Sequence, residues 1–285
     1  LVRINSKLPM EAIEEAYRKI TSPASPSLIE NNQTFHRYLT DGVTVGYRDA
    51  DGVLRHGIVQ VIDSDDPNNN DWAAVNQFTV KGTGRPRRPD IVVFINGLPI
   101  AVIELKNAGD KDATIWTAYN DLQTYKQQIP SLFTTNEILV IADGVYAKVG
   151  SLTADEDRFM PWRTVEGTET APASSVELDV LIRGLFAHER LLEYLKNFIL
   201  FENDGDTVKK KIAGYHQFFA VQEAVKSTVL AASPDGDRKI GVIWHTQGSG
   251  KSLTMAFYAR KVILQPEMEN PTLVVLTDEN DLDNQ

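Results

Sequence analysis

Two apolar runs, residues 91–95 and 100–103, lie close together in the chain and are separated by the dipeptide Asn96-Gly97. Asn-Gly between two apolar runs is a strong signal for a tight β-hairpin turn. Polar residues do not alternate with apolar ones in either run, as they would in a sheet with one face in water, so we expect both faces to be buried. The pattern therefore predicts a buried hairpin around which other elements pack.

Apolar residues recur at three- or four-residue intervals in several other segments, which predicts helices. These segments are residues 8–20, 27–39, 112–128, 175–201, 215–230 and 253–264. Short runs rich in apolar and β-branched residues predict further strands. They are residues 43–47, 57–62, 76–81, 137–143, 146–152, 240–244 and 272–277. We therefore expect an α/β fold, with a mixed sheet flanked by helices in the first part of the chain.

Residues 166–175 are small and polar and contain a proline, which predicts a linker between two domains, 1–165 and 166–285.

The absence of cysteine excludes disulfides and thiolate metal sites and is consistent with a cytoplasmic location. No apolar run approaches membrane length and no export signal is visible, so we expect no association with a membrane. The net charge of −10 argues against indiscriminate nucleic-acid binding but leaves a local basic groove open.

Three charged residues flank the predicted hairpin: Asp90 before it, and Glu104 and Lys106 at its end. Residues two apart on a strand share a face, so Glu104 and Lys106 lie on the same side. Asp90 joins them only in some registers. A two-residue loop places Asp90 opposite Ile103, whereas a three-residue loop with Gly97 as a bulge places it opposite Glu104. We favour the second register because it gathers all three charges.

Two carboxylates and a lysine in one pocket are suited to metal-assisted hydrolysis. Asp90 and Glu104 would hold Mg²⁺, which binds the scissile phosphate and activates water, while Lys106 stabilises charge. The alternative is a buried Glu–Lys ion pair that closes the strand end, but the buried hairpin and the preceding Pro-Asp favour catalysis. A basic loop before Asp90 predicts a grip on DNA phosphates, although loop residues of this kind are often only solvated. Its basic residues are Lys81, Arg85, Arg87 and Arg88.

Two other acidic features are not assigned catalytic roles. Glu30 could add a carboxylate to the site of Asp90 and Glu104, but a solvated charge on a helix is the simpler interpretation. Residues 63–71 carry an acidic cluster that lacks the ordered spacing and the distal glutamate of a calcium-binding loop, so we interpret them as an ordinary loop.

A glycine-rich loop, His245-Thr-Gln-Gly-Ser-Gly-Lys-Ser252, lies between a predicted strand and a predicted helix. This is the context of a phosphate-binding loop, although His245 stands where the first glycine is usual. The backbone N–H groups and the helix N-terminus can hold phosphates, the lysine reaches the β and γ phosphates, and the serine binds Mg²⁺. A plain glycine-rich turn would not explain Lys-Ser at the helix start. The residues expected to bind ATP here are Gly248, Ser249, Gly250, Lys251 and Ser252.

The motifs around the hairpin also carry a family resemblance. Pro-Asp followed by Glu-Leu-Lys resembles the PD-(D/E)xK nuclease motif. The longer string Arg-Pro-Asp-Ile-Val…Asn-Gly-Leu-Pro…Glu-Leu-Lys-Asn resembles the motor subunit of type I restriction enzymes. In that family a helix carries Gln-x-x-x-Tyr facing the active site. This chain has Tyr125 at the tyrosine position and Asp121 in place of the glutamine, where a carboxylate could disturb metal or phosphate binding or add a ligand.

The second half of the chain resembles superfamily 2 helicases. Thr246-Gln-Gly-Ser-Gly is similar to their first motif. Gln217 lies where such helicases place an adenine-reading glutamine, although a surface glutamine on a helix is the alternative. Residues 277–283 resemble the following motif, with Glu279 where arginine is usual. We find neither the Walker-B acidic strand nor the arginine finger that such ATPases need, and therefore expect the start of a RecA-like motor domain within a longer polypeptide.

The resemblance implies the restriction subunit of a type I restriction-modification complex. Such a subunit translocates duplex DNA with ATP and cleaves it with Mg²⁺, together with DNA-recognition (specificity) and methyltransferase (modification) subunits. One alternative is another nuclease–helicase fusion, such as a repair or type III restriction enzyme. Another is a non-cleaving scaffold that docks DNA or subunits, in which Asp121 marks a decayed site.

Overall fold

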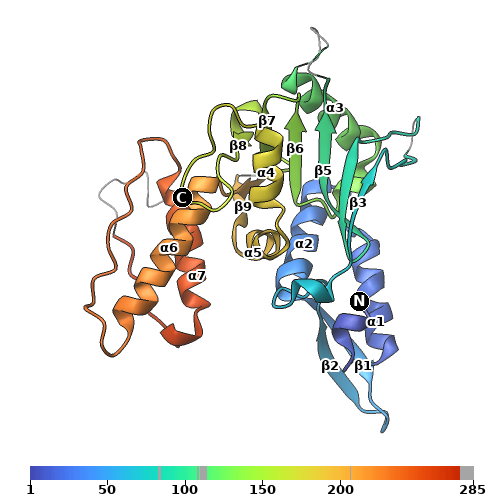
Figure 1. The fold of residues 1–285 in the computed structure, drawn as a ribbon. Helices are drawn as coiled ribbons and strands as arrows, with labels where there is room; N and C mark the ends of the chain where they lie inside the picture. The colour runs from blue at the N-terminus through green and yellow to red at the C-terminus, as the bar shows by residue number, and fades with distance from the viewer. Residues whose placement is uncertain (83–84, 108, 110–113, 206, 277–285) are drawn as a thin grey trace. The chain divides into compact units, whose positions relative to one another are not determined.

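The computed structural model describes residues 1–285 except 83–84, 108, 110–113, 206 and 277–285. The chain forms two compact units, Leu1–Ile212 and Ala213–Gln285 (Figure 1). No helix in the described part of the chain is both long enough and apolar enough to cross a membrane. Short 3₁₀ helices occupy Arg3–Asn5, Pro67–Asn69, Pro130–Phe133, Glu156–Arg158 and Pro266–Met268.

A six-stranded mixed sheet forms the centre of the first unit, with strand order β3-β4-β5-β6-β7-β8. The strands are β3 (Trp72–Asn76), β4 (Ile91–Ile95), β5 (Leu98–Leu105), β6 (Ile138–Ala142), β7 (Ala147–Gly150) and β8 (Met160–Pro161). Strands β5 and β6 run parallel, whereas the other neighbours are antiparallel. Parallel neighbours need a crossover connection, and helix α3 (Ile115–Gln128) provides it. The prediction of a mixed sheet flanked by helices is confirmed.

Helix α3 covers one face of this sheet, and helix α4 (Glu177–Leu185) packs against β7 on the other side (Figure 1). An apolar core fills the space between α3 and the central strands. Its buried members there are Val92, Val102, Ile115, Ala118, Leu122, Tyr125, Leu139 and Ile141. Strands β5 and β6 are buried on both faces, as their uninterrupted apolar runs predicted, whereas β4 alternates between buried and half-buried residues.

The register of the β4–β5 hairpin combines features of both predicted registers. Ile95 pairs with Leu98 across a two-residue turn, in which Asn96 and Gly97 have φ angles of 52° and 82°. The expected three-residue loop is therefore wrong. A bulge further along β5, around Ile100, shifts the register so that the first residue of β4 pairs with Ile103. The bulge supplies the extra residue that we expected in the loop, and it aligns Asp90 with Glu104.

The amino-terminal elements match the predicted helices and strands in type and order. They are α1 (Met10–Thr21), α2 (Leu28–Asp41), β1 (Val43–Arg48) and β2 (Leu54–Val59), of which β1 and β2 form an antiparallel pair. The strand predicted at residues 76–81 is wrong, because β3 ends at Asn76 and Val80 makes only a single bridge. Gln77 has a positive φ of 50°, and this left-handed conformation ends the strand.

Residues 166–212 belong to the first unit, so that unit extends past the domain boundary expected at residue 165. The single helix expected over residues 175–201 is instead two helices followed by a hairpin. These elements are α4, α5 (His188–Asn197), β9 (Ile199–Asp204) and β10 (Thr207–Ile212). Ala187 has a ψ of 128° and so breaks the helix. The apolar stripe continues through both short helices, so periodicity alone does not show the break.

Lys210 on β10 ties this last hairpin to the core of the first unit. Its Nζ lies 2.6 Å from Glu137 Oε2 and donates to Asn32 Oδ1 and to the Asn136 backbone oxygen, each at 2.9 Å. His36 Nδ1 lies 3.0 Å from the same Glu137 oxygen. All five side chains are buried. Burial alone would raise the pKa of Glu137, but Lys210 and His36 outweigh it and hold that pKa below its ordinary value.

The second unit contains helices α6 (Tyr215–Ala232) and α7 (Lys251–Ile263), which pack against each other and match the predicted helices. The strands predicted at residues 240–244 and 272–277 are wrong as far as the structure describes this unit, because residues 240–244 and 272–276 form no strand. Trp244 and Leu276 are each 90% exposed. A strand needs a neighbour for its backbone hydrogen bonds, and none is described here. The helicase-like motif at residues 277–283 lies outside the described residues.

Candidate active site

The open end of the β4–β5 hairpin brings two carboxylates together. Glu104 lies near the end of β5 and is 3% exposed, and Asp90 directly precedes β4. The Asp90 backbone N–H points to Glu104 Oε2 at 3.4 Å, and Asp90 Oδ2 accepts a 2.8 Å hydrogen bond from the Leu105 N–H. Gln77 donates from Nε2 to Asp90 Oδ1 at 2.7 Å. Both oxygens of Asp90 are thus held beside Glu104.

Lys106 joins this pair from the residue after β5. Its Nζ lies 3.5 Å from Glu104 Oε1 and 2.5 Å from Asp121 Oδ2. Its backbone N–H donates to the Ala142 oxygen at 2.8 Å and so continues the β5–β6 pairing. Burial lowers the pKa of Lys106, but the two carboxylates raise it by more, so the side chain stays an ammonium. The structure therefore brings together the three charged residues that the sequence singled out.

Helix α3 contributes two side chains, one turn apart, to the same place. Tyr125 donates its hydroxyl to Glu104 Oε1 at 3.3 Å, and Asp121 contacts Lys106. Burial and the nearby Glu104 raise the pKa of Tyr125, so its hydroxyl remains a hydrogen-bond donor. The apolar core under α3 fixes the direction of both side chains, because Ala118 and Leu122 on the same helix are fully buried.

The electrostatics of Glu104 reflect a site with an excess of negative charge. Burial, followed by the charge of Asp90, raises the pKa of Glu104 to about 7, and Lys106 only partly offsets this. A divalent cation would relieve the repulsion between the two carboxylates, and carboxylate oxygens are ligands that Mg²⁺ prefers. The donor set therefore fits Mg²⁺. Among the described residues no group of three or more His, Cys, Asp or Glu could hold a metal, so Mg²⁺ would keep water or substrate oxygens as further ligands.

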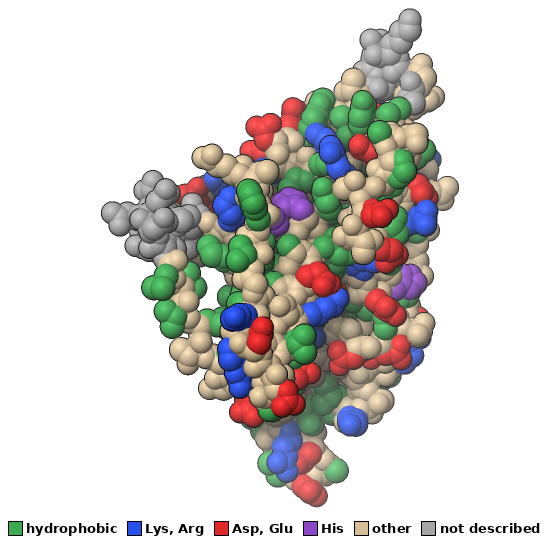
Figure 2. Space-filling view, turned by 60° about the vertical axis from the view of Figure 1, so that its left-hand side comes forward, with side chains coloured by type: hydrophobic (Ala, Val, Ile, Leu, Met, Phe, Trp, Pro, Cys, Tyr) green, Lys and Arg blue, Asp and Glu red, His purple; other side chains and the backbone are tan. Residues whose placement is uncertain are grey.

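The predicted basic loop is only partly free to contact DNA. Lys81, Arg85 and Arg88 are exposed. Arg87 is half-buried, and its Nε donates to Gln128 Oε1 at the end of α3. Arg87 therefore fastens the loop to the helix. On the face drawn in Figure 2, basic side chains are interspersed with acidic ones, so a phosphate grip depends on local positions.

The predicted phosphate loop connects to α7 as expected. Gly248 and Gly250 have φ angles of 77° and 78°, a conformation that favours glycine. α7 begins at Lys251, so the N–H groups of its first turn have no acceptor within the helix. Lys251 Nζ donates to the backbone oxygens of His245 and Thr246 at 3.2 and 3.1 Å. The Lys251 ammonium is thus hydrogen-bonded to backbone carbonyls of its own loop.

Gln217 lies against this loop within the same unit. Its side chain is buried, accepts a hydrogen bond from the Gly214 N–H at 2.8 Å and donates to the Gly250 oxygen at 2.9 Å. The surface-glutamine alternative is therefore wrong. Both ends of the amide are engaged by backbone groups, so reading adenine would require one of these bonds to exchange. The adenine role stays a prediction.

The roles of three residues were missed or left open by sequence reasoning. Gln77 holds Asp90, and its only sequence signal is a polar residue directly after a strand. Asp121 is the partner of Lys106. The sequence showed only that Asp121 stands where the family has a glutamine, and this did not reveal the contact with Lys106. Glu30, considered as an extra carboxylate, instead accepts a hydrogen bond from Ser25 on the surface.

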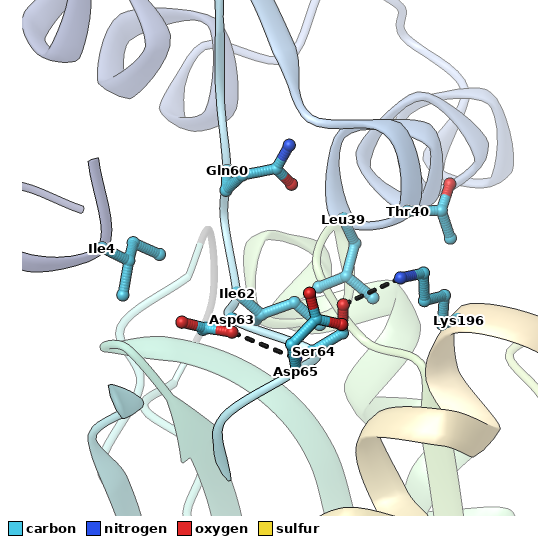
Figure 3. A pocket seen from close by; sticks show the side chains of 9 residues that line it. All are labelled: Ile4, Leu39, Thr40, Gln60, Ile62, Asp63, Ser64, Asp65 and Lys196. Carbon is cyan, nitrogen blue, oxygen red and sulfur yellow. Dashed lines mark hydrogen bonds between the residues drawn. The ribbon is translucent and has the colours of Figure 1, made fainter. Parts of the chain in front are cut away.

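A separate pocket of about 370 Å³ opens between α2, the segment after β2 and α5 (Figure 3). Its lining residues are Ile4, Leu39, Thr40, Gln60, Ile62, Asp63, Ser64, Asp65 and Lys196. None of the residues predicted for catalysis lines it. Asp63 accepts hydrogen bonds from the backbone N–H groups of Asp65 and Asp66 and from Asn69, so the acidic loop is a self-capped turn, as its interpretation as an ordinary loop predicted.

Comparison with known protein families identifies relatives of both parts of the chain. Residues 1–158 match the family described as type I restriction enzyme R protein N terminus (HSDR_N). The chain belongs to this family. Residues 216–285 match the family described as SWI2/SNF2 ATPase. The HSDR_N match spans the whole site of Asp90, Glu104, Lys106 and Tyr125, and the second match contains Gln217 and the phosphate loop.

Several named proteins are similar over most or nearly all of the chain. The HindI endonuclease subunit of a type I restriction enzyme from Haemophilus influenzae is 46% identical over 99% of the chain. A Methanocaldococcus jannaschii protein given the name of a type I restriction enzyme MjaIXP endonuclease subunit is 38% identical over 99% of the chain. The SauCOLORF180P endonuclease subunit of Staphylococcus aureus is 26% identical over 76%. The chain spans only 27%, 28% and 22% of these three relatives.

Proposed function

We propose that this chain carries the nuclease site and the first part of the ATP-driven motor of a type I restriction endonuclease subunit. The observation that carries the proposal is the convergence of Asp90, Glu104 and Lys106 at one end of a hairpin, with Tyr125 on Glu104. A purely structural Glu–Lys ion pair would not need Asp90 held on both oxygens beside Glu104. The names of the similar proteins support the same activity.

The residues of the site have separable tasks in hydrolysis of a DNA phosphodiester. Mg²⁺ held by Asp90 and Glu104 would polarise the scissile phosphate and activate a water molecule. Lys106 presents a positive charge to the phosphate oxygens. Tyr125 fixes one oxygen of Glu104 and leaves the other for the metal. Gln77 orients Asp90. Among the basic loop residues, the exposed Lys81, Arg85 and Arg88 would contact the DNA backbone.

The second unit supplies the nucleotide-binding start of the motor. The N–H groups of Gly248, Ser249 and Gly250 would hold the phosphates of ATP. Lys251 would exchange its contacts with loop carbonyls for the β and γ phosphates, and Ser252 would bind the accompanying Mg²⁺. In this proposal the whole subunit translocates duplex DNA in the cytoplasm, together with specificity and modification subunits.

Substituting Asp90 tests the nuclease assignment. In the full-length subunit, assembled with its partner subunits, Asp90→Asn should abolish Mg²⁺-dependent cleavage of DNA because one of two metal-binding carboxylates is lost. ATP hydrolysis should continue at the parental rate, because the phosphate loop belongs to the other compact unit. Gel assays of cleavage and a phosphate-release assay measure the two activities side by side.

Asp179→Asn is the matched control for this experiment. Asp179 is exposed on α4, where it pairs with the equally exposed Arg183, and its substitution should change neither activity. Cleavage that survives in the Asp90→Asn enzyme would contradict the nuclease assignment. Loss of both activities in a folded Asp90→Asn protein would contradict the separation of nuclease and motor.

Binding of Mg²⁺ should weaken as the pH falls below about 7. Glu104 has a pKa raised to about 7, and the metal needs its carboxylate form, so a proton competes with the metal below that pH. Affinity should fall by up to about tenfold per pH unit below 7 and level off above it. Calorimetric titration of Mg²⁺ into the chain at about pH 6 and pH 8 measures this, with Glu104→Gln as the variant that should lose the site. Equal affinities at both pH values would contradict the prediction.

A further inference from the structure

Two carboxylates lie close to the Lys106 ammonium, Glu104 on β5 and Asp121 on α3. Asp121 is the nearer of the two. The Lys106 Nζ is 2.5 Å from Asp121 Oδ2 but 3.5 Å from Glu104 Oε1. Asp121 is 40% exposed at the side chain, whereas Glu104 is buried. The more accessible carboxylate thus makes the closer contact with the ammonium.

Asp121 is not placed as a third metal-binding carboxylate. Among the residues that the structure describes, no three His, Cys, Asp or Glu side chains are arranged to hold a metal ion together, so Asp121 does not complete such a set with Asp90 and Glu104. Asp121 instead contacts Lys106. It lies on α3 one turn before Tyr125, which the same helix directs to Glu104. The direct contact of Asp121 in this site is therefore the one with the Lys106 ammonium.

We propose that Asp121 is a positioning residue, which keeps the Lys106 ammonium at the phosphate-binding end of the site when Glu104 is engaged by a metal ion. If Glu104 held a divalent cation, its charge would no longer be available to the Lys106 ammonium, which lies 3.5 Å from it. A lysine has a flexible four-carbon stem, so without another partner it would move away. A carboxylate that the metal does not share retains it. A neutral glutamine, which the resembling enzymes carry at this position, could hold the ammonium only through its amide oxygen.

The inference rests on the proposed nuclease function, and Asp121→Asn tests it in the assembled full-length enzyme. Asparagine keeps the shape but removes the charge. The maximal rate of DNA cleavage at saturating Mg²⁺ should fall about 10- to 100-fold, as for loss of a group that orients a site residue. The Mg²⁺ concentration for half-maximal cleavage should not change. Asp121→Glu, which restores a carboxylate, should recover most of the rate.

A second readout needs neither metal nor activity. In the metal-free chain, the reaction of Lys106 with an amine-acylating reagent, followed by mass spectrometry, should become severalfold faster in Asp121→Asn. The exposed Lys226, paired with Glu223 in the other unit, serves as internal reference and should not change. Unchanged labelling of Lys106 would show that Asp121 does not hold it, and would overturn the proposal.

The kinetic outcomes separate this inference from the proposed function. An unchanged cleavage rate in Asp121→Asn, alongside lost cleavage in Asp90→Asn, overturns the inference alone. A raised Mg²⁺ requirement with an unchanged maximal rate makes Asp121 a metal ligand and likewise overturns it. Cleavage that survives Asp90→Asn removes the proposed function itself. Asp179→Asn again controls for loss of a surface carboxylate.

Discussion

Replacing Lys210 with methionine should lower the free energy of unfolding of this chain by about 3–5 kcal/mol, the usual effect of removing one partner of a buried ion pair. Lys210 and Glu137 have fully buried side chains, and Lys210 also donates to Asn32 and to the Asn136 backbone oxygen. Methionine fills much of the same volume but leaves the Glu137 carboxylate with His36 alone. Urea unfolding, followed by far-ultraviolet circular dichroism, measures the change.

The adjacent Lys209 offers a matched control on the same strand. It is exposed and pairs with Asp204 at the surface, so Lys209→Met should leave the unfolding midpoint unchanged. Adding Glu137→Gln to Lys210→Met should recover much of the lost stability, because the isolated buried charge is then gone. A Lys210→Met chain with the parental midpoint would show that the ion pair does not stabilise the fold.

Replacing Glu104 with glutamine should stabilise the metal-free chain at alkaline pH. The pKa of Glu104 is raised from 4.5 to about 7, which corresponds to a penalty of roughly 3 kcal/mol on its charged form in the folded state. The penalty is complete above about pH 7, declines as the folded protein takes up the proton, and is absent below pH 4.5. Glutamine cannot carry the charge. The variant should therefore be more stable than the parent at pH 8 and equally stable near pH 4.5.

Urea unfolding in the presence of a chelator, at both pH values, measures this difference. Added Mg²⁺ should stabilise the parent and not the variant, since only the parent keeps the metal-binding carboxylate. Glu169→Gln, at an exposed position, is the control and should have the parental stability at both pH values. A Glu104→Gln chain that is less stable than the parent at pH 8 would show that the carboxylate contributes more through its contacts than it loses through burial.

The hairpin and its three charges could be predicted because they are local. Asn96-Gly97 encodes the turn, and the apolar runs encode the burial of both strands. The mechanism of the register could not be predicted, because Ile100 lies in a uniformly apolar run and any residue of that run could have formed the bulge. The predicted alignment of Asp90 with Glu104 was correct for the wrong local reason.

The errors elsewhere come from interactions between residues far apart in sequence. The break at Ala187 leaves the apolar periodicity intact, so two short helices resemble one long helix. Lys210 and Glu137 are 73 residues apart, and neither carries a local signal of its partner. The segment 240–244 has the composition of a strand, but composition does not supply the neighbouring strand with which it would pair.

The position of Lys210 also bears on how this protein is made. The chain leaves the ribosome amino terminus first, so Glu137 emerges well before the lysine that neutralises it. The first unit therefore completes its core only after β10 has emerged, when translation has already entered the glycine-rich loop of residues 245–252. A gene cut at residue 158, where the HSDR_N match ends, would encode Asp90, Glu104 and Lys106 without Lys210, the buried partner of Glu137. A boundary that would leave the first unit with its complete core is consequently expected after Ile212 and not at residue 158.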